Sequence, residues 1–276
     1  MDWLTVICFG AIFLLGVPHG ALDPSIAQHS LNLQGRPVKS VFYLLYLVLA
    51  VVSFVVWFYL PVVSLGVFLL VSCLHFGRER EFDTSCGGLP FGCLVVGLPV
   101  LVNFDAVISI FSVITLKSAF DPGLNVITYG LALLGVWGFT LCMRDVLTRR
   151  RVALGTELVL LALCAYWVTP LVYFTLYFCL MHSAKHLIFE LRYLPPQHRK
   201  SSVANAAVVM GATAILAIWG YQSSEILERP ADRLLFTMFA GLAALTYPHM
   251  ALMEVVRFRR KRFGAAHEGV NAQARA

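Results

Sequence analysis

The sequence predicts an all-α membrane protein, a polytopic bundle of about nine transmembrane helices. Of its 276 residues, 59% are hydrophobic and only 13% are charged, whereas about a quarter of a soluble domain is charged. Apolar runs of about 20 residues, the length that crosses a bilayer, recur along the whole chain. We therefore expect one integral-membrane helical domain over residues 1–263, followed by a small, polar, disordered cytoplasmic tail over 264–276.

The nine expected helices follow from these apolar runs. Tight proline turns at Leu60-Pro61 and Thr169-Pro170 divide two stretches that are too long for single spans. The first run lacks the basic segment and the small-residue cleavage site of a signal peptide, so we expect it to remain as a helix. The expected ranges are 2–18, 39–60, 62–77, 89–115, 124–144, 151–168, 170–192, 202–220 and 233–256.

The distribution of lysine and arginine predicts the orientation of the helices. With the N-terminus outside, seventeen of the 21 basic residues fall in cytoplasmic loops or the tail, and only Lys117, Arg229 and Arg233 fall in outside loops. This asymmetry follows the positive-inside rule. The net charge of +6 therefore reflects orientation in the lipid bilayer rather than nucleic-acid binding. We expect a multi-pass protein of the cell membrane with a cytoplasmic C-terminus.

Two histidines stand inside one of the apolar runs. His182 and His186 are four residues apart, so a helix presents both imidazoles on one face, where they could chelate one metal ion. Polar residues are costly inside a membrane and usually serve a function there. This spacing makes the pair the leading candidate for a metal site.

Three more histidines fall at a similar expected depth. His19, His75 and His249 lie near the inner ends of their helices, roughly 18–25 Å from the outer ends at about 1.5 Å per residue. A lone histidine in a membrane helix is most often a hydrogen-bonded packing residue, but several at one depth favour a shared metal site. The remaining histidines lie in loops or the tail, where we expect solvent exposure: His29, His198 and His267.

Carboxylates follow three of these histidines by four residues. They are Asp23 after His19, Glu79 after His75 and Glu190 after His186. A carboxylate one turn along could accept the second ring N–H of a liganding histidine and so fix its orientation. Glu79 and Glu190 could equally be interfacial charges at helix ends.

The spacing alone does not select the metal. Four imidazoles could close a structural tetrahedral zinc site, or leave two positions of an octahedral ferrous ion open for dioxygen. The zinc-protease pattern His-Glu-x-x-His is absent because position 183 is serine. Membrane di-iron desaturases contain more histidine pairs than the single His-x-x-x-His of this chain.

Three motifs together resemble a known family. They are Gly16-Val17-Pro18-His19-Gly20-Ala21-Leu22-Asp23, His75-Phe76-Gly77 and His182-Ser183-Ala184-Lys185-His186. In length, helix number and order of histidines, the chain is similar to the bacterial β-carotene dioxygenases of the bacteriorhodopsin-related-protein (Brp/Blh) family. The residue before the last histidine of the pair is usually arginine in that family, and here Lys185 keeps the charge.

The resemblance implies the reaction and the ligands. It implies cleavage of the central double bond of β-carotene by dioxygen into two molecules of all-trans-retinal, and a retinal-binding protein as a possible acceptor of the product. It also implies one Fe(2+) held by His19, His75, His182 and His186. His249 lies outside this set, so we expect it beside the metal, as a hydrogen-bonding or substrate-pocket residue. Aromatic faces stabilise electron-poor carbon, and the expected pocket candidates are Phe76, Tyr177, Phe178 and Tyr247.

Other functions remain open on the residues alone. A membrane haem or redox protein would use the histidines as axial ligands, although two on one helical face argue against that arrangement. A non-enzymatic carotenoid or retinal carrier needs no metal and leaves the clustered histidines unexplained. A retinal photoreceptor with Lys185 as its Schiff base is disfavoured by the number of helices and by the interfacial position of the lysine.

Overall fold

The computed structural model describes residues 3–31, 33, 36–78, 88–193, 196–224 and 227–273, and within these ranges every regular element is a helix. By length and composition, five helices could cross a membrane, or six if one sharply bent pair counts as a single span. The predicted all-α membrane fold is confirmed at this level. Nine spans and the orientation of the termini stay predictions.

The N-terminal helix changes its winding before the first histidine motif. Helix α1 (Trp3–Ala11) continues into the π-helical segment η1 (Ile12–Gly16), α2 (Val17–Ala21) and α3 (Asp23–Ser30). The N–H of Val17 donates to the carbonyl of Ile12, five residues earlier. Pro18 follows directly and has no N–H of its own to donate, so it favours an irregular turn at this point.

The boundary between the next two helices lies where the proline predicts it. Helix α4 (Arg36–Tyr59) stops before Leu60, and α5 (Pro61–Arg78) begins at the proline itself. At the end of α4, the fully buried indole of Trp57 donates to the carbonyl of Ile114, 3.0 Å away.

The prediction of one helix over 89–115 is wrong. Helices α6 (Leu89–Val102) and α7 (Phe104–Thr115) meet at an angle of 107°. Asn103 lies between them with a non-helical backbone, and its side chain accepts a hydrogen bond from the N–H of Ala106 at 3.2 Å. The break arises because Asn103 caps the start of α7 instead of continuing α6.

The remaining elements are long helices and a second winding change. They are α8 (Pro122–Arg149), α9 (Val152–Trp167), α10 (Pro170–Leu176), the π-helical η3 (Tyr177–Ser183), α11 (Ala184–Tyr193), α12 (Pro196–Ser223) and α13 (Pro230–Gln273). Helix α13 takes in most of the stretch 264–276, and a disordered tail there stays a prediction.

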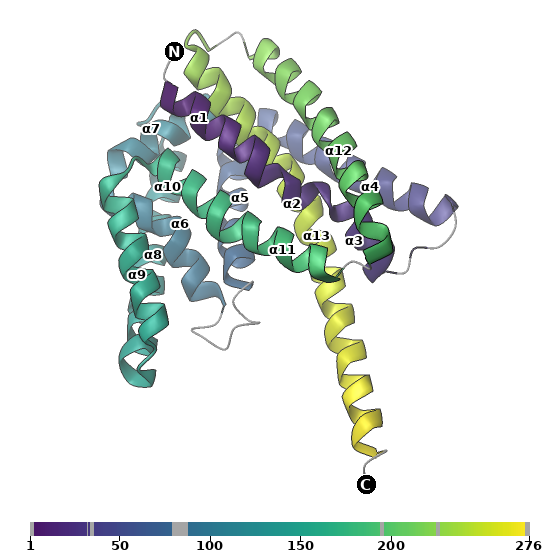
Figure 1. Cartoon of the computed structure of the whole chain (residues 1–276). Helices are drawn as coiled ribbons and strands as arrows, with labels where there is room; N and C mark the ends of the chain where they lie inside the picture. The colour runs from purple at the N-terminus through teal and green to yellow at the C-terminus, as the bar shows by residue number, and fades with distance from the viewer. Residues whose placement is uncertain are drawn as a thin grey trace.

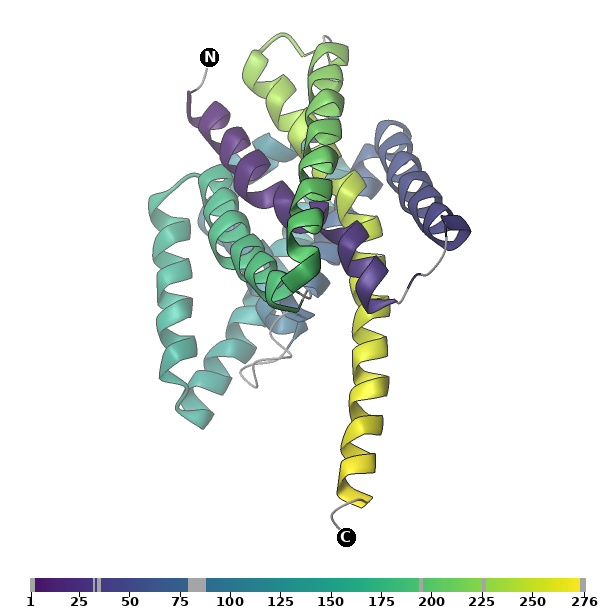
Figure 2. The ribbon, with the colours of Figure 1, turned by 45° about the vertical axis from the view of Figure 1, so that its right-hand side comes forward.

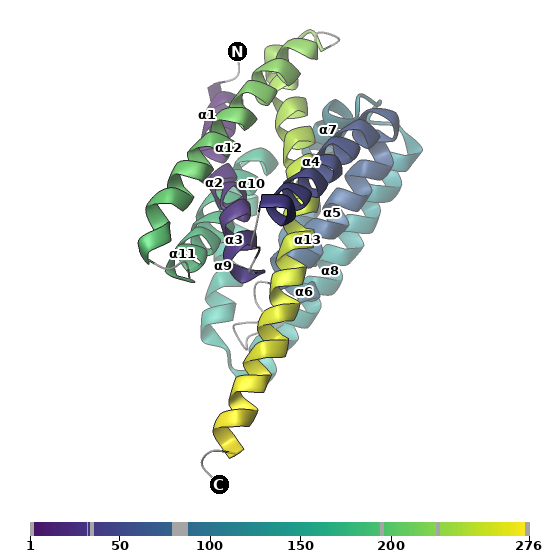
Figure 3. The same cartoon turned by 90° about the vertical axis from the view of Figure 1, so that its right-hand side faces the viewer.

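Helix α13 forms the axis of the bundle. Figure 3 shows it running between one group that contains α1, α2, α3, α10, α11 and α12 and another that contains α4, α5, α6, α7 and α8. Helices α4 and α9 lie at opposite edges (Figure 2). The start of α1 and the end of α13 lie at opposite ends of the molecule (Figure 1). The two groups therefore meet across α13.

Candidate functional site

Four imidazoles from different parts of the chain form a closed ring of neighbours inside the bundle. His75 lies in the last turn of α5, His182 in η3, His186 in α11 and His249 in α13. Their ring centroids are 4.6 Å apart for His75 and His182, 5.4 Å for His75 and His249, 5.5 Å for His186 and His249, and 6.3 Å for His182 and His186. The helices that carry them run in the same direction through the bundle (Figure 1). The fold thus gathers four of the five histidines predicted at one depth.

The closest contact in this histidine cluster joins His75 and His182. Their Nε2 atoms lie 3.2 Å apart, and both side chains are buried. One ring could donate N–H to the other. Two imidazoles that bind one ion at about 2.1 Å, at an angle of 90–110°, also place their nitrogens about 3.0–3.4 Å apart. The spacing therefore suits either a hydrogen bond or a shared metal.

His249 is held by a buried carboxylate. Its Nδ1 lies 2.8 and 2.9 Å from the two carboxylate oxygens of Asp23, which is 0% exposed. The hydroxyl of Tyr46 donates to Oδ2 of the same carboxylate at 2.7 Å. Sequence reasoning assigned Asp23 to His19 and did not find Tyr46. A tyrosine hydroxyl needs a hydrogen-bond partner when it is buried. A tyrosine inside an apolar helix was therefore the signal that could have identified Tyr46.

Four other residues were predicted at or near the site: His19, Glu79, Glu190 and Tyr247. The side chain of His19 and the whole of Glu79 lie outside the described part of the chain. Glu190 is buried on α11, one turn after His186. Tyr247 donates its hydroxyl to the carbonyl of Ser64 at 3.3 Å. The predicted roles of His19, Glu79 and Glu190 stay predictions.

Two aromatic rings pack directly on His182. Phe178 stacks on it with centroids 5.5 Å apart and planes 20° apart, and Phe76 meets it edge-on at 4.9 Å. Phe178 and His182 both lie in η3, where the N–H of Ala184 bonds to the carbonyl of Cys179, five residues back. Such single π turns are frequent at functional sites.

The donor chemistry of the cluster fits a transition metal. Neutral imidazole is a common ligand of iron and zinc, and a buried set of imidazoles is a suitable donor set. Among the described residues, no three His, Cys, Asp or Glu side chains already form a metal-binding group. The side chain of His19, a predicted ligand, lies outside those residues, so the metal stays a prediction.

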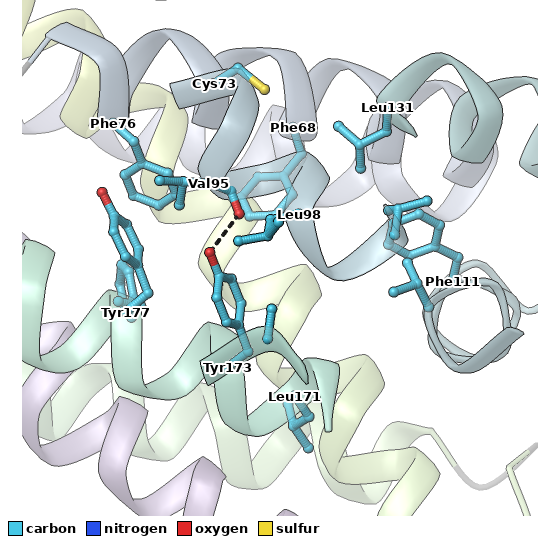
Figure 4. Packing of buried hydrophobic residues seen from close by; sticks show 14 of the residues in the cluster. Phe68, Cys73, Phe76, Val95, Leu98, Phe111, Leu131, Leu171, Tyr173 and Tyr177 are labelled. Atoms are coloured by element: carbon cyan, nitrogen blue, oxygen red, sulfur yellow. Dashed lines mark hydrogen bonds between the residues drawn. The ribbon is translucent and has the colours of Figure 1, made fainter. Parts of the chain in front are cut away.

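An apolar cavity lies next to the histidine cluster. Its cavity volume is about 90 Å³, and the space between its lining atoms amounts to about 690 Å³ when the part open to the exterior is included. Figure 4 shows Phe76 and Tyr177 at one end, and Phe111 and Leu131 at the other. The lining residues are Phe68, Leu69, Ser72, Phe76, Val95, Val96, Pro99, Val100, Val107, Ile110, Phe111, Leu131, Pro170, Leu171, Tyr173, Phe174, Tyr177 and Phe239.

Phe76 connects the cavity to the histidines. Its ring lines the cavity and lies 5.8 Å from His75, in addition to its contact with His182. Of the four aromatic residues predicted for a substrate pocket, Phe76 and Tyr177 line this cavity, whereas Phe178 packs on His182 and Tyr247 bonds to Ser64. Their contact with substrate stays a prediction.

The cavity wall offers little to a polar molecule. The hydroxyl of Tyr173 is already used in a hydrogen bond to the carbonyl of Val95, 3.1 Å away (Figure 4). The other lining side chains are almost all aliphatic or aromatic. A long hydrocarbon suits such a space, because it fills an apolar pocket without needing hydrogen-bonding partners.

Comparison with known proteins shows the family of the chain. The sequence profile of the family described as "Beta-carotene 15,15'-dioxygenase" matches residues 10–257. A protein of that description from uncultured marine bacterium 66A03 is 31% identical over 271 residues, covering 93% of this chain and 94% of the relative. No solved structure matches the chain. The resemblance carried by the three histidine motifs is confirmed, and the chain belongs to the β-carotene 15,15'-dioxygenase family of carotenoid-cleaving enzymes.

Proposed function

We propose that this protein cleaves the central double bond of β-carotene with dioxygen and releases two molecules of all-trans-retinal. The carbon–carbon double bond breaks, and each of its two carbons forms a carbonyl with one oxygen atom of the same dioxygen molecule. The reaction balances without another reductant or proton donor. The observation that supports it best is the apolar cavity that meets a buried imidazole cluster at Phe76, in a chain of this family.

The proposed metal ligands are His19, His75, His182 and His186. When bound, Fe(2+) supplies the open coordination positions at which dioxygen is activated. The chain contributes neutral nitrogen donors and a buried surrounding. His75 and His182 are already at the spacing of two ligands of one ion, and the stacked ring of Phe178 limits the rotation of His182.

The cavity side chains would hold and orient the polyene. Phe76 and Tyr177 lie 5.1 Å apart by ring centroids, at the end of the cavity next to the histidines. Their faces would stabilise electron deficiency that develops along the polyene during oxidation. The opposite end, at Phe111 and Leu131, would limit how far the chain enters and so determine which bond lies at the histidines.

The proposed setting is the cell membrane, with nine spans, an outside N-terminus and a cytoplasmic C-terminus. The substrate dissolves in the bilayer, so an embedded enzyme could take it up from between the lipid chains. A retinal-binding protein would accept the product, because retinal is itself poorly soluble in water.

The test is expression in a bacterium that accumulates β-carotene, with and without oxygen, followed by chromatography of the extracted pigments. We expect oxygen-dependent loss of β-carotene, with retinal as the sole new product. Unchanged pigment beside well-inserted, iron-containing protein would reject the reaction. A Soret absorption band in the purified protein would indicate a haem protein instead, and bound but intact carotenoid would indicate a carrier.

A further inference from the structure

We infer that His249 is an additional imidazole ligand of the metal, and that Asp23 and Tyr46 hold it in position. This inference rests on the proposed metal site, for which the resemblance supplies four other histidines. It concerns three residues from three helices: Asp23 opens α3 and bonds both to Tyr46 in α4 and to His249 in α13.

The position of His249 closes the histidine cluster. Its ring lies 5.4 Å from that of His75 and 5.5 Å from that of His186, both shorter than the 6.3 Å between His182 and His186. It is 3% exposed. A residue that only supported the cluster from outside would approach one ligand. His249 instead lies next to two proposed ligands, His75 and His186.

The bonds of His249 define which nitrogen is available to a metal. A carboxylate only accepts hydrogen bonds, so Nδ1, which faces both oxygens of Asp23, carries the proton. In the neutral ring, Nε2 then bears the lone pair. This nitrogen is completely buried and lies on the side of the ring away from Asp23. Liganding histidines usually have this arrangement, with the second ring nitrogen bonded to a carboxylate or carbonyl.

Tyr46 completes the support of the carboxylate. Its hydroxyl donates to Oδ2 at 2.7 Å, so Asp23 receives hydrogen bonds from both α4 and α13. A buried carboxylate without partners is costly, and removal of one partner leaves the buried charge uncompensated. A metal cation beyond His249 would compensate the buried negative charge through the imidazole. A protonated His249 would offset the same charge as an ion pair, but its Nε2 would then carry a proton and could not bind a metal.

The experiment compares purified full-length protein with the variants His249→Ala, Asp23→Asn and Tyr46→Phe. X-ray absorption of the iron-loaded samples reports the number of imidazoles around the metal, and titration reports iron affinity. We expect His249→Ala to lose one imidazole from the metal environment. Asp23→Asn should keep the number and weaken iron binding by about 10–100-fold. Tyr46→Phe should act in the same direction and less strongly.

A matched control is available elsewhere in the chain. The rings of His29 and His198 lie 4.7 Å apart, close to the spacing of His75 and His182, but His198 is exposed at the start of α12. His198→Ala should leave the number of imidazoles and the iron affinity unchanged. Imidazole added to His249→Ala should restore iron binding, because a small ligand can enter the space left by the side chain.

Two results would overturn parts of this picture separately. A His249→Ala protein that keeps the wild-type imidazole count and iron affinity rejects His249 as a ligand and leaves the proposed reaction intact. A wild-type protein that binds no iron, and cleaves β-carotene without it, rejects the metal site of the proposed function itself. If His249→Ala does not fold, as judged by gel filtration and thermal unfolding, His249→Gln provides the same comparison with an amide that still donates to Asp23.

Discussion

The Nε2 atoms of His75 and His182 lie 3.2 Å apart in the interior, although 107 residues separate them in the chain. If both bind one iron, His182→Ala removes a ligand, and we expect loss of retinal formation together with loss of bound iron. Membrane insertion should be unchanged, because the spans do not depend on this side chain. Pigment chromatography and metal analysis of the same preparation check both effects. Retained cleavage would remove His182 from the proposed ligand set.

Gly16 packs against the aromatic ring that supports His182. A Cβ at position 16 would overlap Cε1 of Phe178, and Phe178 stacks on His182. Gly16→Ala must therefore displace the ring, and we expect about 1–3 kcal/mol of destabilisation together with weaker iron binding. Thermal unfolding and iron titration measure the two effects.

Gly10, in the same N-terminal region, is the control for that substitution. Nothing lies within 4 Å of a Cβ built there, so Gly10→Ala should be neutral or stabilise α1 by up to about 1 kcal/mol. Equal behaviour of the two variants would mean that the contact between Gly16 and Phe178 has no effect on the site.

Leu131 lines the cavity and lies on the side opposite Phe76 and Tyr177 in Figure 4. Leu131→Trp should shorten the cavity, lower kcat/KM for β-carotene by at least about tenfold, and leave iron binding unchanged. Leu133→Trp, on the same helix but 72% exposed, should have little effect. Steady-state kinetics and product chromatography test both variants. Wild-type kinetics in Leu131→Trp would exclude this end of the cavity from substrate binding.

Removal of iron should destabilise the protein as well as inactivate it. A ligand present at 100 times its Kd stabilises the folded state by about 2.7 kcal/mol, so chelator-treated protein should have a lower Tm. Ferrous iron should restore both Tm and activity. Zinc should restore Tm alone, since it binds imidazole without activating dioxygen. Identical unfolding curves with and without chelator would contradict a metal in the histidine cluster.

Local sequence signals predicted much of the fold, because most helices here begin or end at residues that strongly prefer a helix boundary, such as proline. Pro61 and Pro170 start helices where expected. The bend after Val102 was missed, because Asn103 acts there through a hydrogen bond to Ala106 that an apolar pattern does not reveal.

Part of the site depends on contacts that no local pattern encodes. The spacing of His182 and His186 pointed to the cluster, and helix direction added His75 and His249. The pairing of Asp23 with His249 depends on how α3 packs against α13, and the contribution of Tyr46 depends on the approach of α4. Asp23 and His249 are 226 residues apart, so their contact is a result of tertiary packing.

The π-helical segment η3 contains His182 and lies between the cavity-lining residues of α10 and His186 in α11. Each residue of an α-helix adds about 100° of rotation, so the extra residue of a π turn sets the angle between these two groups of side chains. Regular α-helical winding of the same residues would turn His186 by about that angle relative to Leu171 and Tyr173, whereas deletion of one residue within Tyr177–Cys179 would remove the π turn and keep the angle. The alignment of cavity and imidazoles is thus a property of chain length at this point as well as of residue identity.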